Sequence, residues 1–289
     1  MFPLLFLTLI IEPTLADRLA PLIKGHTGKV AIAVKNLETG ETFFHQADDV
    51  MPTASLIKVA ILVEAYLQAD AGTFALKDPV TLREADKVPG SGLLTMHFSD
   101  GATFPIRDAI RLMTAVSDNT ATNLVLDKVG IAAVNKRMAE WGLPETRINA
   151  KVYRGSTTSV DPERTKKYGL GSTTAREMVA LFEQIAVGDR LRSALKQAVL
   201  GHLKANDDTE KFPRYLPAGA VLAHKDGAVS DARTDAGILY TPGGAVAICV
   251  LTTQNEDKSW RKDNAGSLLC ARVAREVWEH YRTPRGTRP

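Results

Sequence analysis

The sequence predicts an α+β fold, with an antiparallel sheet formed by both ends of the chain and an all-helical lobe inserted between them. Alternating apolar residues with intervening turns occur early, in residues 29–46, and again late, in residues 220–252. Helical periodicity dominates the stretch in between. We therefore expect an α/β lobe from residues 17–52 and 205–289, and a helical lobe from residues 53–204.

Size and composition are those of a globular protein with a sizeable core. The chain has 289 residues, of which 45% are hydrophobic and 24% are charged, and its net charge is +3. The basic residues are scattered rather than clustered, which argues against a nucleic-acid partner. We expect a monomer.

Residues 1–16 resemble a secretory signal segment, although the usual basic start is missing. Residues 1–11 form an apolar run too short to span a bilayer, and residues 14–16 (TLA) offer a small-residue cleavage site. We expect an exported protein, periplasmic or secreted, without a stable membrane span.

The first half of the chain reads as a hairpin followed by helices. Residues 29–46 (KVAIAVKNLETGETFFHQ) alternate and turn at ETG, which predicts a β-hairpin. Residues 55–68 (SLIKVAILVEAYLQ) are apolar on all sides, which indicates a buried helix. Residues 90–105 read as a polar loop that contains glycine. Further helices are expected at residues 106–116, 121–130 and 131–142.

The second half begins with a long segment of weak periodicity, residues 143–172, and such segments are usually functional or disordered. Two helices follow, then three strands of which the last two form a hairpin, and then a final helix. The helices are expected at residues 173–185, 190–203 and 264–281, and the strands at residues 220–227, 236–242 and 245–252.

The two cysteines, Cys249 and Cys270, have no histidine or second cysteine at metal-binding spacing, so we expect no metal site. Both fit small buried side chains. Whether they pair in a disulfide is left open.

Ser55 and Lys58 form the pattern S-x-x-K at the start of the predicted buried helix. A spacing of three places both side chains on one helix face. A lysine whose pKa is lowered by burial or by a neighbouring cation can take the proton of a serine hydroxyl, and the helix dipole favours negative charge at this end. The alternative is that Ser55 is only an N-cap.

Ser117, Asp118 and Asn119 lie between two predicted helices. The serine there can pass a proton to a leaving group, and the asparagine amide can hold a substrate carbonyl. Helix capping by the serine and the aspartate is the alternative.

Lys225, Asp226 and Gly227 end a predicted strand. The lysine can supply positive charge to a substrate anion and to Ser117, and the glycine lets a substrate backbone lie against the strand edge. The alternative is an exposed strand end without a function.

The patterns S-x-x-K, S-D-N and K-[T/S]-G, in this order, mark class A β-lactamases and penicillin-binding proteins. With SLIK, SDN and KDG in these places, and with GLPETRIN and STTAREM between them, the chain resembles the class A β-lactamase family over residues 17–281. The resemblance implies a β-lactamase/transpeptidase-like fold, an active-site serine hydrolase, and no cofactor or metal.

The resemblance also implies individual roles. Ser55 would be the acylated nucleophile, Lys58 its proton partner, and Ser117 the relay of a proton to the leaving nitrogen. Asn119 would bind the carbonyl of the substrate's acyl side chain, and Lys225 would attract the substrate carboxylate. The oxyanion hole would consist of the backbone N–H groups of Ser55 and Ala228.

Asp226 departs from the family, which has Thr or Ser there with a hydroxyl that donates to the substrate carboxylate. An ionised aspartate only accepts hydrogen bonds and repels a carboxylate. We expect Asp226 to face the site and to narrow or shift substrate choice, with Lys225 pairing with it or Arg233 taking over the carboxylate. The alternative is that Asp226 points away.

The long loop departs as well. In the family, the glutamate that activates the deacylating water follows the arginine of G-L-x-E-T-R by five residues. Here that arginine is Arg147, and the position holds Val152, which cannot activate water. Glu145 fits the short pattern E-x-x-[L/I]-N of that glutamate, but the register makes it the structural glutamate of GLPETR. The candidates for a deacylation base are Glu163, Asp161, Lys58 and Glu145.

The sequence therefore predicts an enzyme that is acylated at Ser55 by β-lactams and hydrolyses the β-lactam amide, with weak deacylation. Three alternatives stay open, because fold alone does not decide function. They are a penicillin-binding, D,D-peptidase-like enzyme acting on peptidoglycan-like substrates, another serine hydrolase, and a β-lactam sensor that stays acylated.

Overall fold

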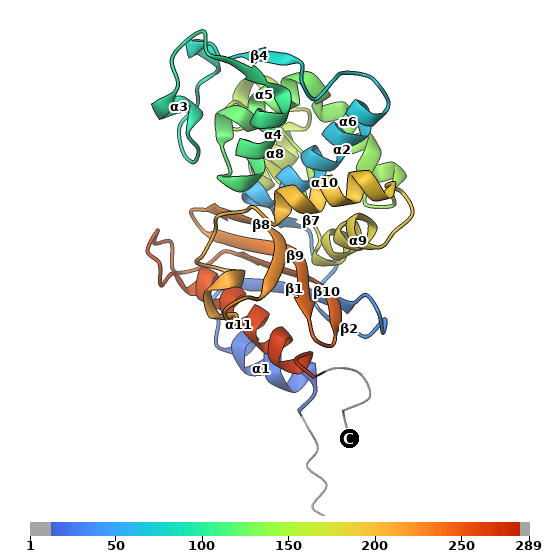
Figure 1. Ribbon diagram of the computed structural model, residues 1–289. Helices are drawn as coiled ribbons and strands as arrows, with labels where there is room; N and C mark the ends of the chain where they lie inside the picture. The colour runs from blue at the N-terminus through green and yellow to red at the C-terminus, as the bar shows by residue number, and fades with distance from the viewer. Residues whose placement is uncertain (1–12, 284–289) are drawn as a thin grey trace, which may run out of the picture.

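A computed structural model describes residues 13–283. Its main sheet has five antiparallel strands in the order β2-β1-β10-β9-β8. The strands are β1 (Lys29–Asn36), β2 (Thr42–His45), β8 (Val221–Val229), β9 (Ala232–Thr241) and β10 (Gly244–Thr253). Because β1 pairs with β10, both ends of the chain meet in one sheet (Figure 1). The predicted α+β class, with its antiparallel sheet from both termini, is confirmed.

Helices cover both faces of this sheet. Successive side chains along its strands point to opposite faces, and the apolar ones on each face form a separate core. Ala33 and Cys249 belong to the core shared with α9 (Ala175–Ala186) and the helical lobe. Their neighbours Ile32 and Ile248 belong to the core under α1 and α11. These two helices come from opposite ends of the described chain, α1 from Leu15–Lys24 and α11 from Ala265–His280. Although α9 lies inside the segment predicted as the helical lobe, it packs against the sheet.

The helical lobe surrounds α2, whose residues from Lys58 to Tyr66 are all buried. This burial fits the all-apolar pattern that predicts a buried helix. The surrounding helices are α4 (Ile106–Ala115), α5 (Asn119–Val129), α6 (Ile131–Glu140) and α10 (Ser193–Leu203), and α2 itself is Lys58–Asp70. Figure 1 shows this lobe above the sheet, with α10 between them.

The helical lobe is not all-helical, which corrects the prediction. It contains a three-stranded sheet in the order β3-β7-β6 and a two-stranded sheet of β4 and β5. These strands have two or three residues each, so no alternating pattern is long enough to show in the sequence. They are β3 (Met51–Pro52), β4 (Pro79–Thr81), β5 (Thr103–Pro105), β6 (Arg147–Ile148) and β7 (Gly171–Thr173). The predicted loop 90–105 also contains a short helix, α3 (Leu94–His97).

The long segment 143–172 is folded rather than irregular. It runs from β6 through two short helices, α7 (Gly155–Thr158) and α8 (Pro162–Tyr168), to β7. Asp161 caps α8 by accepting a hydrogen bond from the Arg164 N–H, and proline follows at the first helical position. The elements are too short for periodicity to reveal them.

Helix α1 begins at Leu15, inside the predicted signal segment. Thr14 caps it, and Asp17 completes a capping box by accepting from the Thr14 N–H. Leu15 is buried in the core under α1 and α11. Cleavage after Ala16 would therefore remove the N-cap and the first two residues of a packed helix. The apolar run itself, residues 1–11, lies outside the described residues, and within the described part no helix is long and apolar enough to cross a membrane.

The two cysteines do not pair. Cys249 on β10 and Cys270 on α11 are both buried and free. They belong to the two different cores, Cys249 to the core shared with α9 and Cys270 to the core under α11. The sheet therefore separates their environments.

Candidate active site

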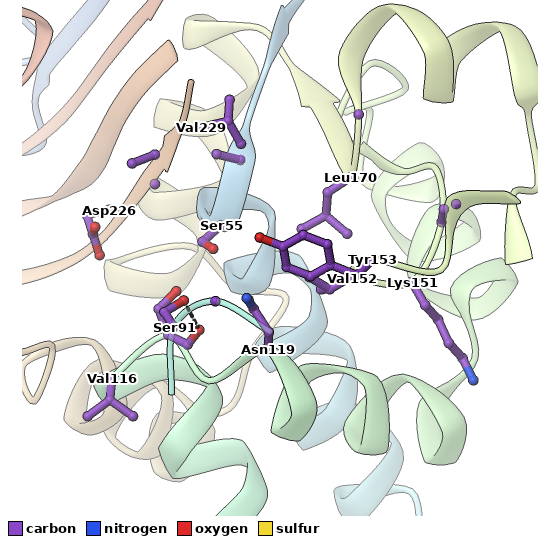
Figure 2. A pocket seen from close by; sticks show the side chains of 18 of the residues that line it. Ser55, Ser91, Val116, Asn119, Lys151, Val152, Tyr153, Leu170, Asp226 and Val229 are labelled. Atoms are coloured by element: carbon purple, nitrogen blue, oxygen red, sulfur yellow. Dashed lines mark hydrogen bonds between the residues drawn. The ribbon is translucent and has the colours of Figure 1, made fainter. Parts of the chain in front are cut away.

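A cleft of about 750 Å³ opens between the sheet and the helical lobe, and it contains most of the predicted site. Its walls come from the turn at Ser55, the loop at Ser91, the link between α4 and α5, residues 150–155 of the long segment, and the edge strand β8. Figure 2 shows side chains from these five segments converging on one space.

Ser55 lies in a 3-10 turn, η1 (Ala54–Ile57), directly before α2. The preceding residue, Ala54, has a φ of 47°, a left-handed conformation that is rare for a residue with a Cβ. Strand β8 approaches this turn so closely that a Cβ on Gly227 would lie 2.6 Å from the Thr53 carbonyl oxygen and 2.9 Å from the Leu56 nitrogen. Glycine at this position thus lets the strand edge reach the serine.

Lys58 is fully buried and joins α2 to the link between α4 and α5. Its Nζ donates to the carbonyl oxygen of Ser117 at 2.7 Å, to the Ser117 Oγ at 3.2 Å and to Asn119 Oδ1 at 3.1 Å. Burial lowers the pKa of the Lys58 ammonium well below its usual value, and the positive charge of Lys225 lowers it further. The negative charges of Asp118 and Asp226 raise this pKa, but only in part. The neutral amine therefore forms at a lower pH than in an exposed lysine. Because it has two N–H groups, its lone pair can then accept the third contact from the Ser117 hydroxyl.

Ser117 and Asn119 both line the cleft, and Asp118 between them has a structural function. Asp118 caps α5 through the Ala121 N–H at 2.8 Å. Its second oxygen accepts from the N–H groups of Leu93 and Leu94, at 2.7 and 2.9 Å. The aspartate of the S-D-N pattern therefore fixes the loop that forms one wall of the cleft.

Backbone strain is concentrated in the cleft. Among the described residues, five that are not glycine have a positive φ, and three of these line the cleft. They are Ala54, Ser117 and Tyr153, with φ values of 47°, 54° and 55°. Sparsely populated backbone conformations of this kind cluster at functional sites, because the surrounding structure has to hold them in place.

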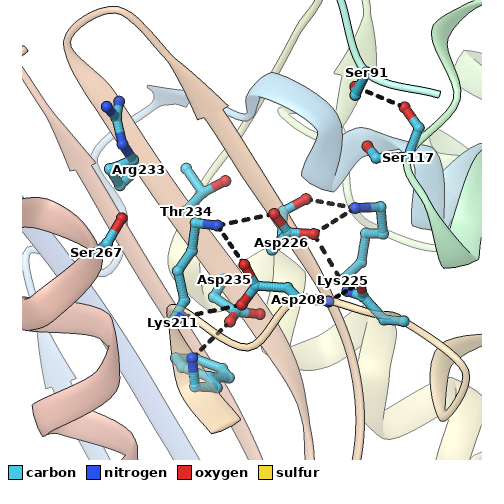
Figure 3. A network of polar contacts seen from close by, with 12 residues as sticks. Ser91, Ser117, Asp208, Lys211, Lys225, Asp226, Arg233, Thr234, Asp235 and Ser267 are labelled. Carbon is cyan, nitrogen blue, oxygen red and sulfur yellow. Dashed lines mark hydrogen bonds and ion pairs between the residues drawn. The ribbon is translucent and has the colours of Figure 1, made fainter. Parts of the chain in front are cut away.

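Asp226 lies at the other end of the cleft, in a buried network of charges. Its Oδ1 accepts from Lys225 Nζ at 2.7 Å, and its Oδ2 accepts from Lys211 Nζ at 2.9 Å (Figure 3). Burial opposes ionisation of Asp226, but the two ammonium groups outweigh it and hold the pKa of this carboxyl well below its usual value. Asp226 is therefore ionised, and Lys211 Nζ also donates to Asp208 Oδ1 at 2.9 Å.

Arg233 is not brought to the cleft, which corrects the expectation that it could take over a substrate carboxylate. Its guanidinium donates to backbone carbonyl oxygens, at 2.9 Å for Ala232, and also to those of Val229 and Ser259. The side chain is buried beside Trp260, whose ring lies 4.9 Å from the guanidinium carbon. The cation is thus occupied in holding the β8–β9 hairpin and the segment before α11.

No carboxylate of the long segment lines the cleft. Val152 lies on its wall, at the position where the resemblance places a glutamate. Glu145 accepts from Arg164 Nη2 at 2.8 Å, away from the cleft, and Asp161 is the cap of α8. Glu163 is exposed on the first turn of α8 and does not line the cleft either.

Several lining residues carry no signal in the sequence patterns. Ser91 donates its hydroxyl to the Ser117 carbonyl oxygen at 2.9 Å. Tyr153 is 66% exposed, and Figure 2 shows its hydroxyl end turned toward Ser55. Trp260 is 71% exposed and lines the cleft from the segment before α11. For Tyr153 and Trp260, the signal that the sequence offers is an aromatic residue in a stretch without helical or strand periodicity.

Nothing in the described part of the chain resembles a metal centre, since no group of three or more His, Cys, Asp or Glu side chains is placed to hold an ion. The chemistry that this arrangement offers is that of a serine beside a buried amine, a second hydroxyl and a strand edge.

Comparisons with known proteins agree with this arrangement. A family model described as "Beta-lactamase enzyme family" matches residues 14–281. A β-lactamase of Streptomyces cellulosae is 27% identical over 249 residues, which cover 84% of this chain and 77% of that protein.

Two solved structures are similar in fold and in sequence. An ancestral class A β-lactamase aligns with a TM-score of 0.80 and 25% identity, covering 92% of this chain and 99% of the other. PBP-A aligns with a TM-score of 0.77 and 26% identity, covering 92% and 94%, and a leucine-to-glutamate mutant of PBP-A has been solved as an acyl-enzyme complex with penicillin G. The family match over nearly the whole chain, together with this fold and this cleft, shows that the chain belongs to the β-lactamase enzyme family.

Proposed function

We propose that this protein is an active-site serine hydrolase that β-lactams acylate at Ser55, and that hydrolysis of the acyl-enzyme is its slow step. The observation that carries the proposal is the buried amine of Lys58. It lies one helical turn after Ser55 and contacts Ser117 and Asn119, two polar side chains that line the cleft.

In acylation, Ser55 Oγ attacks the carbonyl carbon of the lactam, and its proton passes to Lys58 Nζ, either directly or through the Ser117 hydroxyl. The ring C–N bond then breaks, and the nitrogen takes the proton of the Ser117 hydroxyl. Lys58 Nζ then returns a proton to Ser117 Oγ. The 3.2 Å contact between Lys58 Nζ and Ser117 Oγ supports this relay. Backbone N–H groups at Ser55 and Ala228 would hold the oxyanion, and each such donor is worth about 3 kcal/mol in other enzymes.

Deacylation lacks a dedicated base in this proposal. The nearest segment of the long loop presents Val152 and Tyr153, and its carboxylates at Glu145 and Asp161 are engaged elsewhere. Water activation is therefore left to Lys58, which must serve in both steps. A general base in position contributes about 10²- to 10⁴-fold to a rate, so the absence of a second base placed for the water predicts a long-lived acyl-enzyme.

A second candidate function, a penicillin-binding enzyme that acts on peptidoglycan-like peptides, is favoured by one specific observation. The cleft has no carboxylate at Val152, and a long-lived adduct is what inhibition by β-lactams requires. The similarity to PBP-A supports the same alternative. Either function calls for an exported enzyme, which the apolar run of residues 1–11 also favours.

Intact-mass spectrometry tests the proposal. The protein is mixed with benzylpenicillin and sampled from milliseconds to hours, beside the variant Ser55→Ala. We expect one adduct per chain on the wild-type protein, located to Ser55 by peptide mapping, and none on the variant. Adduct formation that is equal in both proteins would overturn the assignment of Ser55, and the absence of any adduct or turnover would overturn the function.

A further inference from the structure

The end of the cleft at Asp226 carries acceptors where the family presents donors. Asp226, Asp207 and Asp208 all line the cleft, whereas the Lys225 side chain is fully buried and does not line it. Lys225 Nζ donates to both the backbone oxygen and Oδ1 of Asp226, at 2.8 and 2.7 Å. A ligand that reaches this end therefore meets the carboxylate of Asp226 and not the ammonium of Lys225.

A second cation makes this arrangement stable. Lys211 is buried and bridges Asp208 and Asp226 at 2.9 Å each, so two lysines and two carboxylates neutralise one another (Figure 3). Neither ammonium group is left to balance the charge of an incoming anion. Asp207 adds a third carboxyl group on the same wall, with a pKa raised by burial and by the charge of Asp226.

Asp226 retains the capacity to accept one more hydrogen bond. A carboxylate has about four acceptor positions. Oδ1 uses two of them, for Lys225 and for Asn206 Nδ2 at 3.3 Å, and Oδ2 uses one, for Lys211. The remaining position is on Oδ2, and the Asp226 side chain is 17% exposed on the cleft wall. An uncharged N–H donor would satisfy it, whereas a carboxylate would face it with like charge.

We propose that Asp226 is a specificity-determining residue, which selects substrates that present an uncharged hydrogen-bond donor, such as a carboxamide, at the place where penicillins carry a carboxylate. This inference rests on the proposed acylation of Ser55. The carboxylate of Asp226 then recognises a substrate group instead of only repelling one. Substrates that carry an amide at this place are preferred over those that carry a free acid.

The test compares three forms of one penicillin, with the free carboxylate, the primary carboxamide or the methyl ester. The ester carries neither charge nor donor, so it separates the two parts of the inference. The acylation rate at Ser55 is measured for each by mass spectrometry of the wild-type protein. We expect the carboxamide to react at least tenfold faster than the carboxylate, with the ester between them.

Equal rates for carboxylate and carboxamide would overturn the inference while leaving the proposed function standing. An ester as fast as the carboxamide would overturn the role of the hydrogen bond. No adduct with any of the three forms would instead overturn the proposed function itself. Because this comparison uses the wild-type protein, it does not depend on how a variant folds.

Variants give an independent check. Asp226→Thr restores a hydroxyl and frees Lys225 from its carboxylate partner, whereas Lys211 keeps its ion pair with Asp208. In this variant we expect the preference to reverse in favour of the carboxylate. Asp189→Asn, which removes one exposed charge outside the cleft, serves as the matched control and should keep the wild-type order. An unchanged preference in a folded Asp226 variant would contradict the inference.

Discussion

Asn123 holds the main chain of Val152 from both sides. Its Nδ2 donates to the Val152 carbonyl oxygen at 3.0 Å, and its Oδ1 accepts from the Val152 N–H at 2.9 Å. Asn123 lies on α5, the helix that also begins with Asn119, so the wall of the cleft and the polar cluster share one rigid support. The hydrogen bonds involve only backbone atoms of residue 152, so a different side chain at this position can keep both of them.

Val152→Glu should shorten the life of the acyl-enzyme. The backbone at this position is fixed by Asn123, so the new carboxylate will be presented to the cleft that contains Ser55. We expect adduct loss to accelerate by about 10²-fold or more, the usual contribution of a general base. The decay of the penicillin adduct by mass spectrometry measures it. Val152→Gln is the matched control, and an equal acceleration in that variant would mean that polarity rather than base catalysis is responsible.

The acylation rate should depend on the ionisation of Lys58. Burial and Lys225 lower the pKa of this group well below its usual value, so the neutral amine forms at a lower pH than an exposed lysine would allow. We expect the rate to rise with pH through that lowered pKa, because the neutral form takes the serine proton. Lys58→Met should reduce acylation by at least about 10²-fold and remove this rise. Stopped-flow acylation rates between pH 4 and 9 check both, and a rise that persists in Lys58→Met would assign the titration to another group.

Glu145 should prove structural. Its carboxylate accepts from Arg164 Nη2, and its backbone oxygen accepts from Ser172 Oγ at 3.0 Å. We expect Glu145→Gln to change the adduct lifetime by less than about twofold and to cost about 1 kcal/mol of unfolding free energy, in the range of partly exposed ion pairs. Denaturant unfolding and adduct decay are measured on the same sample. A lifetime prolonged tenfold or more would return Glu145 to the list of deacylation bases.

The helical lobe should lose stability in acid through His202. This side chain contacts the Tyr66 hydroxyl at 2.7 Å, and burial lowers the pKa of His202 from 6.5 to about 4. Between these values the unfolded chain binds a proton that the folded chain does not, so stability falls as the pH falls from 6.5 through 4. The full effect is about 3 kcal/mol. Urea unfolding at pH 7 and 4.5 should show a smaller acid loss for His202→Gln than for the wild type, and an identical loss would exclude His202 as the cause.

The parts of the site that the sequence predicts are those set by local spacing. Ser55 and Lys58 are separated by one helical turn. Ser117 lies two residues before Asn119, where α5 begins, so short patterns suffice to place all four residues. The pairing of Lys211 with Asp226 is different, because it joins a loop to a strand and only the folded chain brings them together. The same holds for Trp260, which reaches the cleft from the segment before α11.

The fold was predictable where elements are long. The five strands of the main sheet and the helices of ten residues or more have enough periods to be read, with α1 as the exception. There the capping box of Thr14 and Asp17 was a readable signal that the apolar run before it obscured. The small sheets and α7 and α8 have too few residues for any period, and the strands of the small sheets pair with partners that are distant in the chain.

We expect acylation of Ser55 to be faster than loss of the acyl group, because Val152 lines the cleft at the position where the resemblance places a general base. Pre-steady-state turnover of a chromogenic β-lactam measures both steps in one trace. We predict a burst of one equivalent of opened β-lactam per protein molecule, followed by a slow phase whose rate equals that of adduct loss from Ser55. A linear trace without a burst, at a turnover well above the rate of adduct loss, would contradict the claim.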